Sequence, residues 1–397
     1  MLRRVRLFRL RLFYFLCFAS LGLYLPFLPP WLEARGVTGF SLGLILANLP
    51  ALGLVAPPLF GLLADAFGLR GHLLRIACAG AALAFAALAL TPLVSGRALG
   101  FTSLFAAVLA FACFRAPIIP MVDVIALEEV KSGRATYPRI RIWGSIGFLI
   151  TAVAAGRYID PARASALPLA IAVALTALFA ASFGLPARAE GPPIPLQGHF
   201  RSLLQNTDFV AFLAASFLSQ AAHSSYDICY SLHLRDLGLS GASTGFAWGI
   251  GVVAEVLVMA FGAPLFERFR PPTLLAAAFA GACIRWILVA SITSELGLFA
   301  IQLLHACSFA LMWLSSVAFV KERVPGPVLA TGQGLFTASI AAGSVLGILA
   351  WGPLYHRSGG GLTFASAAVL SALASGVAAW LSRRARNQRP VPRVSPA

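Results

Sequence analysis

Charged residues are scarce in this chain of 397 residues. They make up 11% of the sequence, whereas hydrophobic residues make up 59% and the mean hydropathy is +0.86. A water-soluble domain carries about 25% charged residues, so the composition excludes that class. A separate polar domain is also missing, and the net charge of +16 therefore does not indicate binding to nucleic acid. We expect an all-α protein that crosses a membrane several times.

Paired cysteines and catalytic signatures are missing as well. The six cysteines lie in apolar stretches without CxxC spacing, so we expect packing residues rather than disulfides or metal ligands. His223 and His233 are ten residues apart, which does not suit a shared metal ion. The sequence has no GxSxG, HExxH or Walker motif. We therefore expect neither an enzyme nor a bound metal or other cofactor.

Apolar runs of about 20 residues, the length that crosses a membrane core, recur along the whole chain. Charged residues, glycine and proline separate these runs. They predict twelve membrane-spanning helices near residues 9–33, 39–64, 73–94, 98–126, 138–158, 164–185, 206–234, 241–266, 272–292, 296–320, 328–355 and 361–381.

The longest polar interruption separates six predicted spans from six others. Its Gly-Pro-Pro-Ile-Pro sequence is typical of an extended linker. A small residue followed one turn later by an acid ends both the second and the eighth span, which favours two parallel repeats. We predict an N-terminal six-helix bundle at 1–186, a cytoplasmic linker at 187–205, a C-terminal six-helix bundle at 206–384 and a cytoplasmic tail at 385–397.

Arginine and lysine predict the orientation, because cytoplasmic segments keep most of the positive charge. If both termini are cytoplasmic, the inner segments hold twenty-two of these residues and the outer segments hold six. We therefore expect both termini inside the cell. The same excess of arginine and lysine gives the chain its net positive charge. We interpret this charge as anchoring the protein to the anionic headgroups of membrane lipids.

Several segments resemble a known family of transporters. Residues 23–32 (LYLPFLPPWL) and 58–65 (PLFGLLAD) are similar to the lactose permease branch of the major facilitator superfamily. Residues 139–148 (RIRIWGSIGF) and 302–305 (QLLH) are closer to its phenylpropionate-permease-like members. The resemblance covers nearly the whole chain. It implies two six-helix pseudo-repeats that alternate access to a central site, in a monomer of the bacterial inner membrane driven by a proton gradient.

Three ionisable residues interrupt apolar spans of the second bundle, and such residues are costly unless they serve a function. Glu255 and Arg285 are each fifteen residues from position 270, which places both roughly 22 Å from that turn. Arg285 and His305 are each ten residues from position 295, or roughly 15 Å. We expect the three in one layer, with Glu255 facing Arg285. The alternative is a static ion pair that fixes helix packing.

The resemblance assigns proton coupling and substrate contact to this trio. A lactose-permease-like transporter has a proton-carrying glutamate one turn after the matching histidine, whereas this chain has Ser308. Either Glu255 or Asp227 then carries the proton, or the coupling differs. Asp227 lies in the outer third of the seventh span. The alternative to a functional role is that its side chain forms a hydrogen bond between helices.

Asp123 and Arg141 are the first candidates for substrate binding. Each is nine residues from position 132, so the two side chains could meet. Their positions match an acid and an arginine that hold the sugar in lactose permease. A bidentate pairing of arginine with carboxylate suits a polar ligand. The alternative is a gate near the cytoplasmic mouth.

Arg115 lies deep in the fourth span, where an arginine facing a cavity would attract an organic anion. Together with Arg285 it favours an aromatic acid such as a phenylpropionate, although a pair between Arg115 and Asp123 is the alternative. The resemblance adds Tyr24 to the predicted substrate contacts.

Asp65, Gly68 and Arg70 match a shortened form of the inner gating loop of the superfamily, with a capped helix end as the alternative. The sequence as a whole favours proton-coupled symport of a small organic solute. A proton-driven efflux antiporter and a sugar or nucleoside symporter are the alternatives. A channel would repeat short filter segments, and two six-helix halves suit alternating access better.

Overall fold

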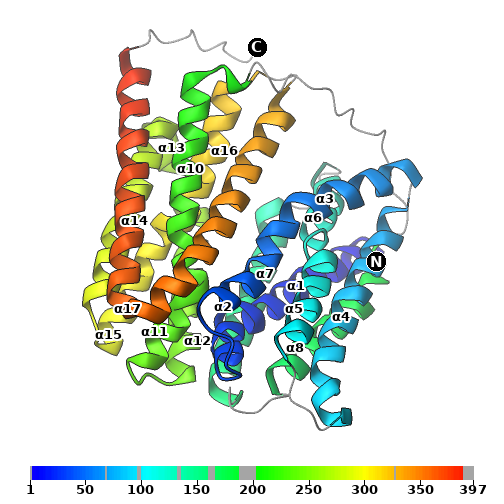
Figure 1. Cartoon of the computed structure of the whole chain (residues 1–397). Helices are drawn as coiled ribbons and strands as arrows, with labels where there is room; N and C mark the ends of the chain where they lie inside the picture. The colour runs from blue at the N-terminus through cyan, green and yellow to red at the C-terminus, as the bar shows by residue number, and fades with distance from the viewer. Residues whose placement is uncertain are drawn as a thin grey trace.

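Every regular element that the structure describes is a helix, which confirms the predicted all-α class. The helices form two groups, called here the first half (α1 to α8) and the second half (α10 to α17), which lie side by side in Figure 1. The computed structural model describes residues 2–67, 69–95, 100–131, 136–159, 166–186, 203–325 and 328–387. The predicted linker at 187–205 and the tail at 385–397 thus lie largely outside the described residues.

The first half is organised around α1, which packs along α7 and α8. Pro117 separates α5 from α6, because proline cannot donate the backbone hydrogen bond that a continuous helix needs. Pro138 in the first turn of α7 occupies a position where no donor is required. The elements are α1 (Leu2–Glu33), α2 (Gly39–Leu46), α3 (Asn48–Phe67), α4 (Arg70–Ser95), α5 (Phe101–Arg115), α6 (Ile118–Lys131), α7 (Tyr137–Tyr158) and α8 (Ala166–Ser182).

The second half contains two π-helical turns, η1 and η3. It begins at Asn206, whose side chain caps α10 by accepting a hydrogen bond of 3.1 Å from the backbone nitrogen of Phe209. Its elements are α10 (Thr207–Ser225), η1 (Tyr226–Tyr230), α11 (Ser231–Asp236), α12 (Gly241–Phe261), α13 (Ala263–Arg268), α14 (Pro271–Ser291), α15 (Glu295–Ile301), η2 (Gln302–Leu304), η3 (Cys307–Leu311), α16 (Met312–Arg323) and α17 (Leu329–Asn387).

Nine helical segments in the described ranges are long and apolar enough to cross a membrane. Three features account for the difference from the twelve predicted spans. The helix α8 is apolar but short, and the path from α10 through α11 is too polar to qualify. The long α17 is two helices joined at Gly359, where φ is +70° and ψ is −175°. The number twelve stays a prediction, whereas a multi-pass membrane protein is established.

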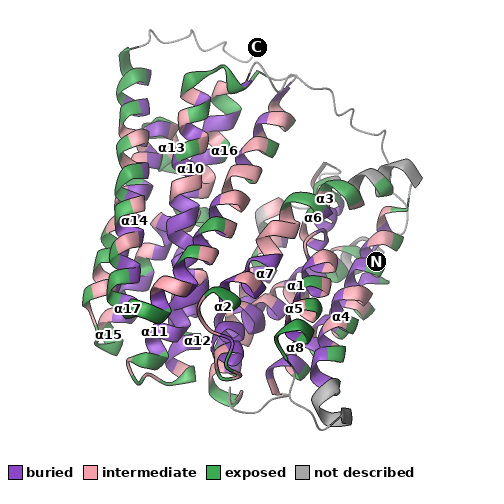
Figure 2. Ribbon diagram, in the orientation of Figure 1, coloured by how far each residue is buried: buried purple, intermediate pink, exposed green. Residues whose placement is uncertain are grey.

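Large apolar side chains cover the outward faces of both halves. Leu83 is 69% exposed and Phe261 is 74% exposed, and Figure 2 shows exposed segments along the outer sides of the helices. So many exposed large apolar side chains are unusual in a soluble monomer. Hydrocarbon chains of a membrane would cover these faces.

The halves meet at one end of the molecule, called here the closed end, where glycines let backbones approach closely. A Cβ atom on Gly245 of α12 would lie 2.2 Å from the carbonyl oxygen of Ala152 on α7. One on Gly352 of α17 would lie 2.4 Å from the carbonyl oxygen of Gly39 at the start of α2. In Figure 1 the halves come together near α2, α11 and α12 and diverge toward the C-terminus. This conformation is therefore shut at one end.

Candidate functional site

Glu255 and His305 form the most direct contact among the predicted site residues. The Nε2 atom of His305 lies 2.6 Å from Oε1 of Glu255, and the two side chains are only 8% and 17% exposed. The contact is an ion pair when His305 is protonated and a hydrogen bond when it is neutral. The buried Nδ1 atom of His305 has no hydrogen-bond partner among the described residues. An acid and an imidazole are thus placed so that a proton can move between them.

Arg285 lies beside this pair and is completely buried. Its guanidinium donates to Oγ of Ser308 and to Oε1 of Gln302, each at 2.8 Å. The same group lies over the rings of Tyr226 and Trp286, at 4.4 and 4.5 Å from the ring centres. Its Nε atom has no partner in the described part of the chain. A buried arginine held by neutral groups keeps an uncompensated positive charge that can attract an anion.

The local backbone explains how these side chains converge. The chain between α15 and α16 leaves the regular α-helix twice, in the 3₁₀ turn η2 and in the π turn η3. These turns bracket His305 and carry Gln302 and Ser308. On α12, Gly251 lies one turn before Glu255, and a Cβ atom there would be 3.2 Å from the His305 ring. The glycine therefore lets α12 approach closely enough for Glu255 to reach the imidazole.

The predicted convergence of Glu255, Arg285 and His305 is thus observed, but the predicted pairing is wrong. Glu255 contacts His305 and forms no ion pair of 4 Å or less with Arg285. The guanidinium is occupied by Ser308 and Gln302 instead. Ser308, which the sequence analysis singled out, is a neutral partner of Arg285.

Asp227 lies on the π turn η1, next to Tyr226, and is partly buried. No described residue donates a hydrogen bond to its carboxylate, and no described cation pairs with it. The predicted alternative of a helix-to-helix hydrogen bond is therefore not observed. Its role in proton coupling stays a prediction.

The four predicted substrate contacts of the first half are organised by α1. Tyr24 is part of that helix, and Arg115 donates a hydrogen bond of 3.2 Å to the carbonyl oxygen of Cys17. The Arg141 guanidinium lies 3.8 Å from the centre of the Phe18 ring. Asp123 accepts a hydrogen bond from the hydroxyl of Tyr14. One face of α1 thus gathers all four.

Asp123 and Arg141 do not form the predicted ion pair. Oδ1 of Asp123 accepts hydrogen bonds from Tyr14 on α1 and, at 3.0 Å, from Tyr137 at the start of α7. Arg141 stacks on Phe18, so its charge is held by an aromatic face rather than by the carboxylate. The two tyrosines outcompete the arginine for the acid in this conformation.

Arg115 is also not paired with Asp123. The sequence analysis gave this pair as an alternative because it placed both residues on one continuous helix. The break at Pro117 places the two residues on different helices, so the angle expected from an unbroken helix does not apply. Arg115 is 3% exposed, and its Nε atom has no partner in the described ranges. Tyr24 is also 3% exposed, and its hydroxyl has no hydrogen-bond partner among the described residues. Both groups retain hydrogen-bonding capacity for a ligand.

Electrostatics connects the two halves. Arg141 of the first half and Arg285 of the second are the cations whose charges act on Glu255. The rings of Phe148 and Trp248, one from each half, lie 6.2 Å apart. The acid therefore responds to charge from both halves.

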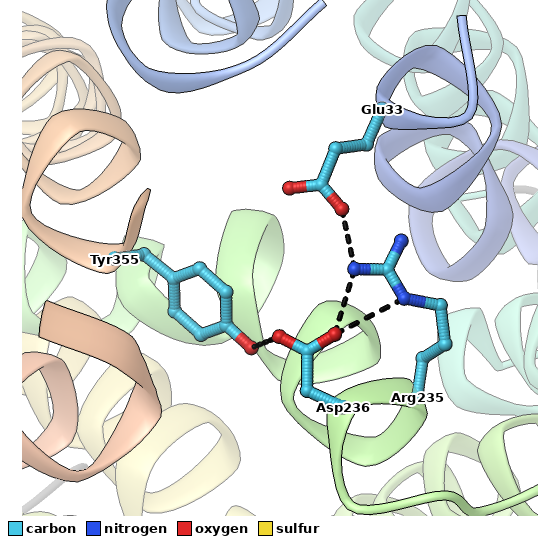
Figure 3. Close-up of polar contacts among 4 residues, drawn as sticks. All are labelled: Glu33, Arg235, Asp236 and Tyr355. Carbon is cyan, nitrogen blue, oxygen red and sulfur yellow. Dashed lines mark hydrogen bonds and ion pairs between the residues drawn. The ribbon is translucent and has the colours of Figure 1, made fainter. Parts of the chain in front are cut away.

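A second polar network, which the sequence analysis missed, joins the halves at the closed end (Figure 3). Arg235 of α11 forms an ion pair with Glu33 at the end of α1. It also contacts Oδ1 of Asp236 at 2.7 Å, and the hydroxyl of Tyr355 donates to Oδ2 of Asp236 at 2.7 Å. Glu33 lies at the end of the first span and Arg235 at the end of the seventh. Opposite charges at equivalent span ends could therefore have predicted this ion pair from the sequence.

The predicted gating loop is only partly described. The side chain of Asp65 and all of Gly68 lie outside the described residues. Arg70 is the first residue of α4. The prediction for this loop stays untested.

Comparison with known proteins identifies what this geometry is similar to. The model of the MFS_1 like family matches residues 7–366. The "Probable 3-phenylpropionic acid transporter" of Escherichia coli (strain K12) is 28% identical, covering 91% of this chain and 94% of the relative. The "Maltose permease" of Geobacillus stearothermophilus is 28% identical over 82% of each chain. The solved structure of the nucleoside transporter NupG has a TM-score of 0.76 at 18% identity, covering 95% and 98% of the two chains. These findings confirm the resemblance predicted from the sequence.

Proposed function

This chain belongs to the MFS_1 like family and is a transporter rather than an enzyme, and we propose that it couples the entry of a small organic solute to the entry of a proton. The contact between Glu255 and His305 carries the proposal. A membrane-buried carboxylate must be neutralised by a proton or by a cation. His305 supplies a partner whose Nε2 atom can exchange a proton with the carboxylate, because the two atoms lie 2.6 Å apart. Loading and release of a proton can therefore change the charge of this site.

We infer that the solute is an organic acid with an aromatic or similarly flat apolar part. Arg115, Arg141 and Arg285 are held by carbonyl, hydroxyl, amide or aromatic groups, so their positive charge remains available to a carboxylate. The rings of Tyr226, Trp248 and Trp286 lie around the second-half site. The name of the Escherichia coli relative supports this substrate class.

The wild-type protein in proteoliposomes tests the proposal. An inward pH gradient of about two units supports roughly 100-fold accumulation if one proton enters with each solute. We expect accumulation of 3-phenylpropionate to approach this limit and to disappear when a protonophore is added. Maltose and a nucleoside serve as competing substrates. Equal uptake with and without the gradient would contradict the coupling, and loss of preloaded solute under the same gradient would indicate efflux.

Alternating access gives the closed end its role. We propose that both termini are cytoplasmic, in a monomer of a bacterial inner membrane, because the positive residues concentrate on the side of the termini. The closed end then faces outward. The loop of Asp65, Gly68 and Arg70 is proposed to regulate closure on the cytoplasmic side.

Arg235→Gln is expected to weaken the outer closure modestly. Arg235 is 44% exposed, and exposed ion pairs contribute roughly 0.2–1 kcal/mol, so the balance between conformations should shift about fivefold or less. Amide hydrogen exchange in α11 and at the end of α1 would measure the shift. Arg357→Gln, which removes another exposed arginine, is the control. A complete loss of transport in Arg235→Gln would show that this arginine does more than close the gate.

A further inference from the structure

Two cavities lie toward the end opposite the closed end, and each combines arginine with an exposed aromatic ring. The C-half cavity, at the end of α17, has a volume of 540 Å³ and is lined by Trp380, Arg383, Arg384 and Asn387. The N-half cavity lies between the start of α1 and the end of α8. It has a volume of 380 Å³ and is lined by Arg9, Leu12, Ala180, Ala181, Phe183 and Gly184.

The two cavities are built in the same way. In the first half, Arg75 near the start of α4 donates a hydrogen bond of 3.5 Å to the carbonyl oxygen of Leu185, just beyond α8. In the second half, Arg270 just before α14 donates one of 2.6 Å to the carbonyl oxygen of Ala385 near the end of α17. In each half, an arginine before or at the start of the third long helix thus holds the end of the last helix. The recurrence makes a chance arrangement of surface arginines a poor explanation.

Stacking of arginine on the exposed ring also recurs. The guanidinium of Arg75 lies 4.9 Å from the centre of the Phe183 ring, and that of Arg384 lies 5.3 Å from the centre of the Trp380 ring. Phe183 is 58% exposed and Trp380 is 42% exposed. Tryptophan at the end of a membrane span marks the level of the lipid headgroups, so Trp380 places the C-half cavity there. The N-half cavity lies at the end of the last helix of the first half, as the C-half cavity does in the second.

At both cavities, arginines outnumber the acidic side chains that the described residues supply as partners. Arg384 pairs with Asp208 at 3.0 Å, and Asp208 is shared with Arg323 at 3.7 Å. Arg9 and Arg383 are exposed and form no ion pair with any acid in the described ranges. In the N-half cavity the absent side chain of Gly184 leaves room for Arg9, because a Cβ atom there would lie 3.0 Å from its Cδ. One arginine in each cavity is thus free to bind an anion.

We propose that each cavity binds the phosphodiester headgroup of an anionic phospholipid, with Arg9 holding the phosphate in the N-half cavity and Arg383 holding it in the C-half cavity. Guanidinium matches phosphate oxygens with two parallel hydrogen bonds. The apolar wall of Leu12, Ala180 and Ala181 would contact the acyl chain next to the headgroup. Free phosphate would gain nothing from that wall or from the exposed rings, which is why a lipid is the expected source.

Native mass spectrometry of the full-length protein tests the proposal without reference to transport. The purified protein is incubated with phosphatidylglycerol, with phosphatidylcholine, or with inorganic phosphate at the same concentration. We expect two molecules of phosphatidylglycerol to be retained, with weaker retention of phosphatidylcholine and none of phosphate. Equal retention of both lipids, or retention of phosphate without lipid, would overturn the proposal.

Single variants assign the sites. Arg9→Gln and Arg383→Gln should each remove one tightly bound phosphatidylglycerol and weaken its binding about fivefold to tenfold, and the double variant should lose both. Arg357→Gln, an exposed arginine near the other end, should change nothing. Arg9→Lys and Arg383→Lys keep the charge and should retain part of the binding. Similar losses in all three glutamine variants would show a general charge effect and overturn the assignment. Because retention is measured without substrate, the result is independent of the proposed proton coupling.

Discussion

Replacing Glu255 with glutamine is expected to abolish uphill accumulation of substrate and to leave exchange of substrate at equal pH intact. Glutamine keeps the size of the side chain and can still contact Nε2 of His305, 2.6 Å away from the acid in the wild type. It cannot gain or lose a proton. Under a two-unit pH gradient, accumulation should fall from roughly 100-fold to roughly equal concentrations on both sides.

The measurement separates coupling from binding. Exchange needs the loaded carrier to reorient but needs no net proton movement, so a variant that is fixed as neutral should retain it. Glu295→Gln, which changes an exposed acid at the start of α15, is the matched control and should accumulate normally. Unchanged uphill uptake by Glu255→Gln would remove this acid from the coupling, and loss of exchange would place it among the substrate contacts.

Asp227→Asn decides between the two acids that the sequence leaves as proton carriers. The charge of Arg285 acts on both acids, but only Glu255 has a direct partner in the described part of the chain, the imidazole of His305 at 2.6 Å. We therefore expect Asp227→Asn to retain more accumulation than Glu255→Gln. The reverse order would move the proton site to η1.

The convergence of Glu255, Arg285 and His305 could be predicted because position along a helical hairpin determines depth. The choice of partners could not, because it depends on rotation about the helix axis. The turns η2 and η3 depart from the 3.6-residue repeat next to His305, so helix phase is lost where the partners are selected. The pairing of Glu255 with Arg285 was predicted for regular α-helices, and η2 and η3 are not regular α-helix.

The first half failed to follow its prediction for a similar reason. Equal spacing placed Asp123 and Arg141 at one depth, but it gave no information on the competing donors Tyr14 and Tyr137. The closed-end network was missed because only the cations were counted at the span ends. Its acids Glu33 and Asp236 contribute little to orientation and were not considered as partners.

Gly245→Val is expected to reduce transport at least about fivefold by preventing closure of the outer end. A Cβ atom on Gly245 would lie 2.2 Å from the carbonyl oxygen of Ala152, and the obstacle is backbone, which cannot move aside as a flexible side chain can. Overpacking of this kind costs roughly 1–3 kcal/mol, which shifts the balance between conformations about 5-fold to 150-fold. The bulky variant should therefore favour conformations in which α7 and α12 are separated.

Hydrogen exchange of α2 and of residues 348–356 would measure this opening, together with transport in proteoliposomes. Gly376→Val makes the same substitution within α17, where a Cβ atom meets nothing within 4 Å, and should leave both readouts unchanged. If Gly245→Val kept wild-type protection and transport, the close approach of α7 and α12 would not be the element that shuts the outer end. A large effect beside the modest one expected for Arg235→Gln would show that backbone packing, more than the ion pair with Glu33, stabilises the closed conformation.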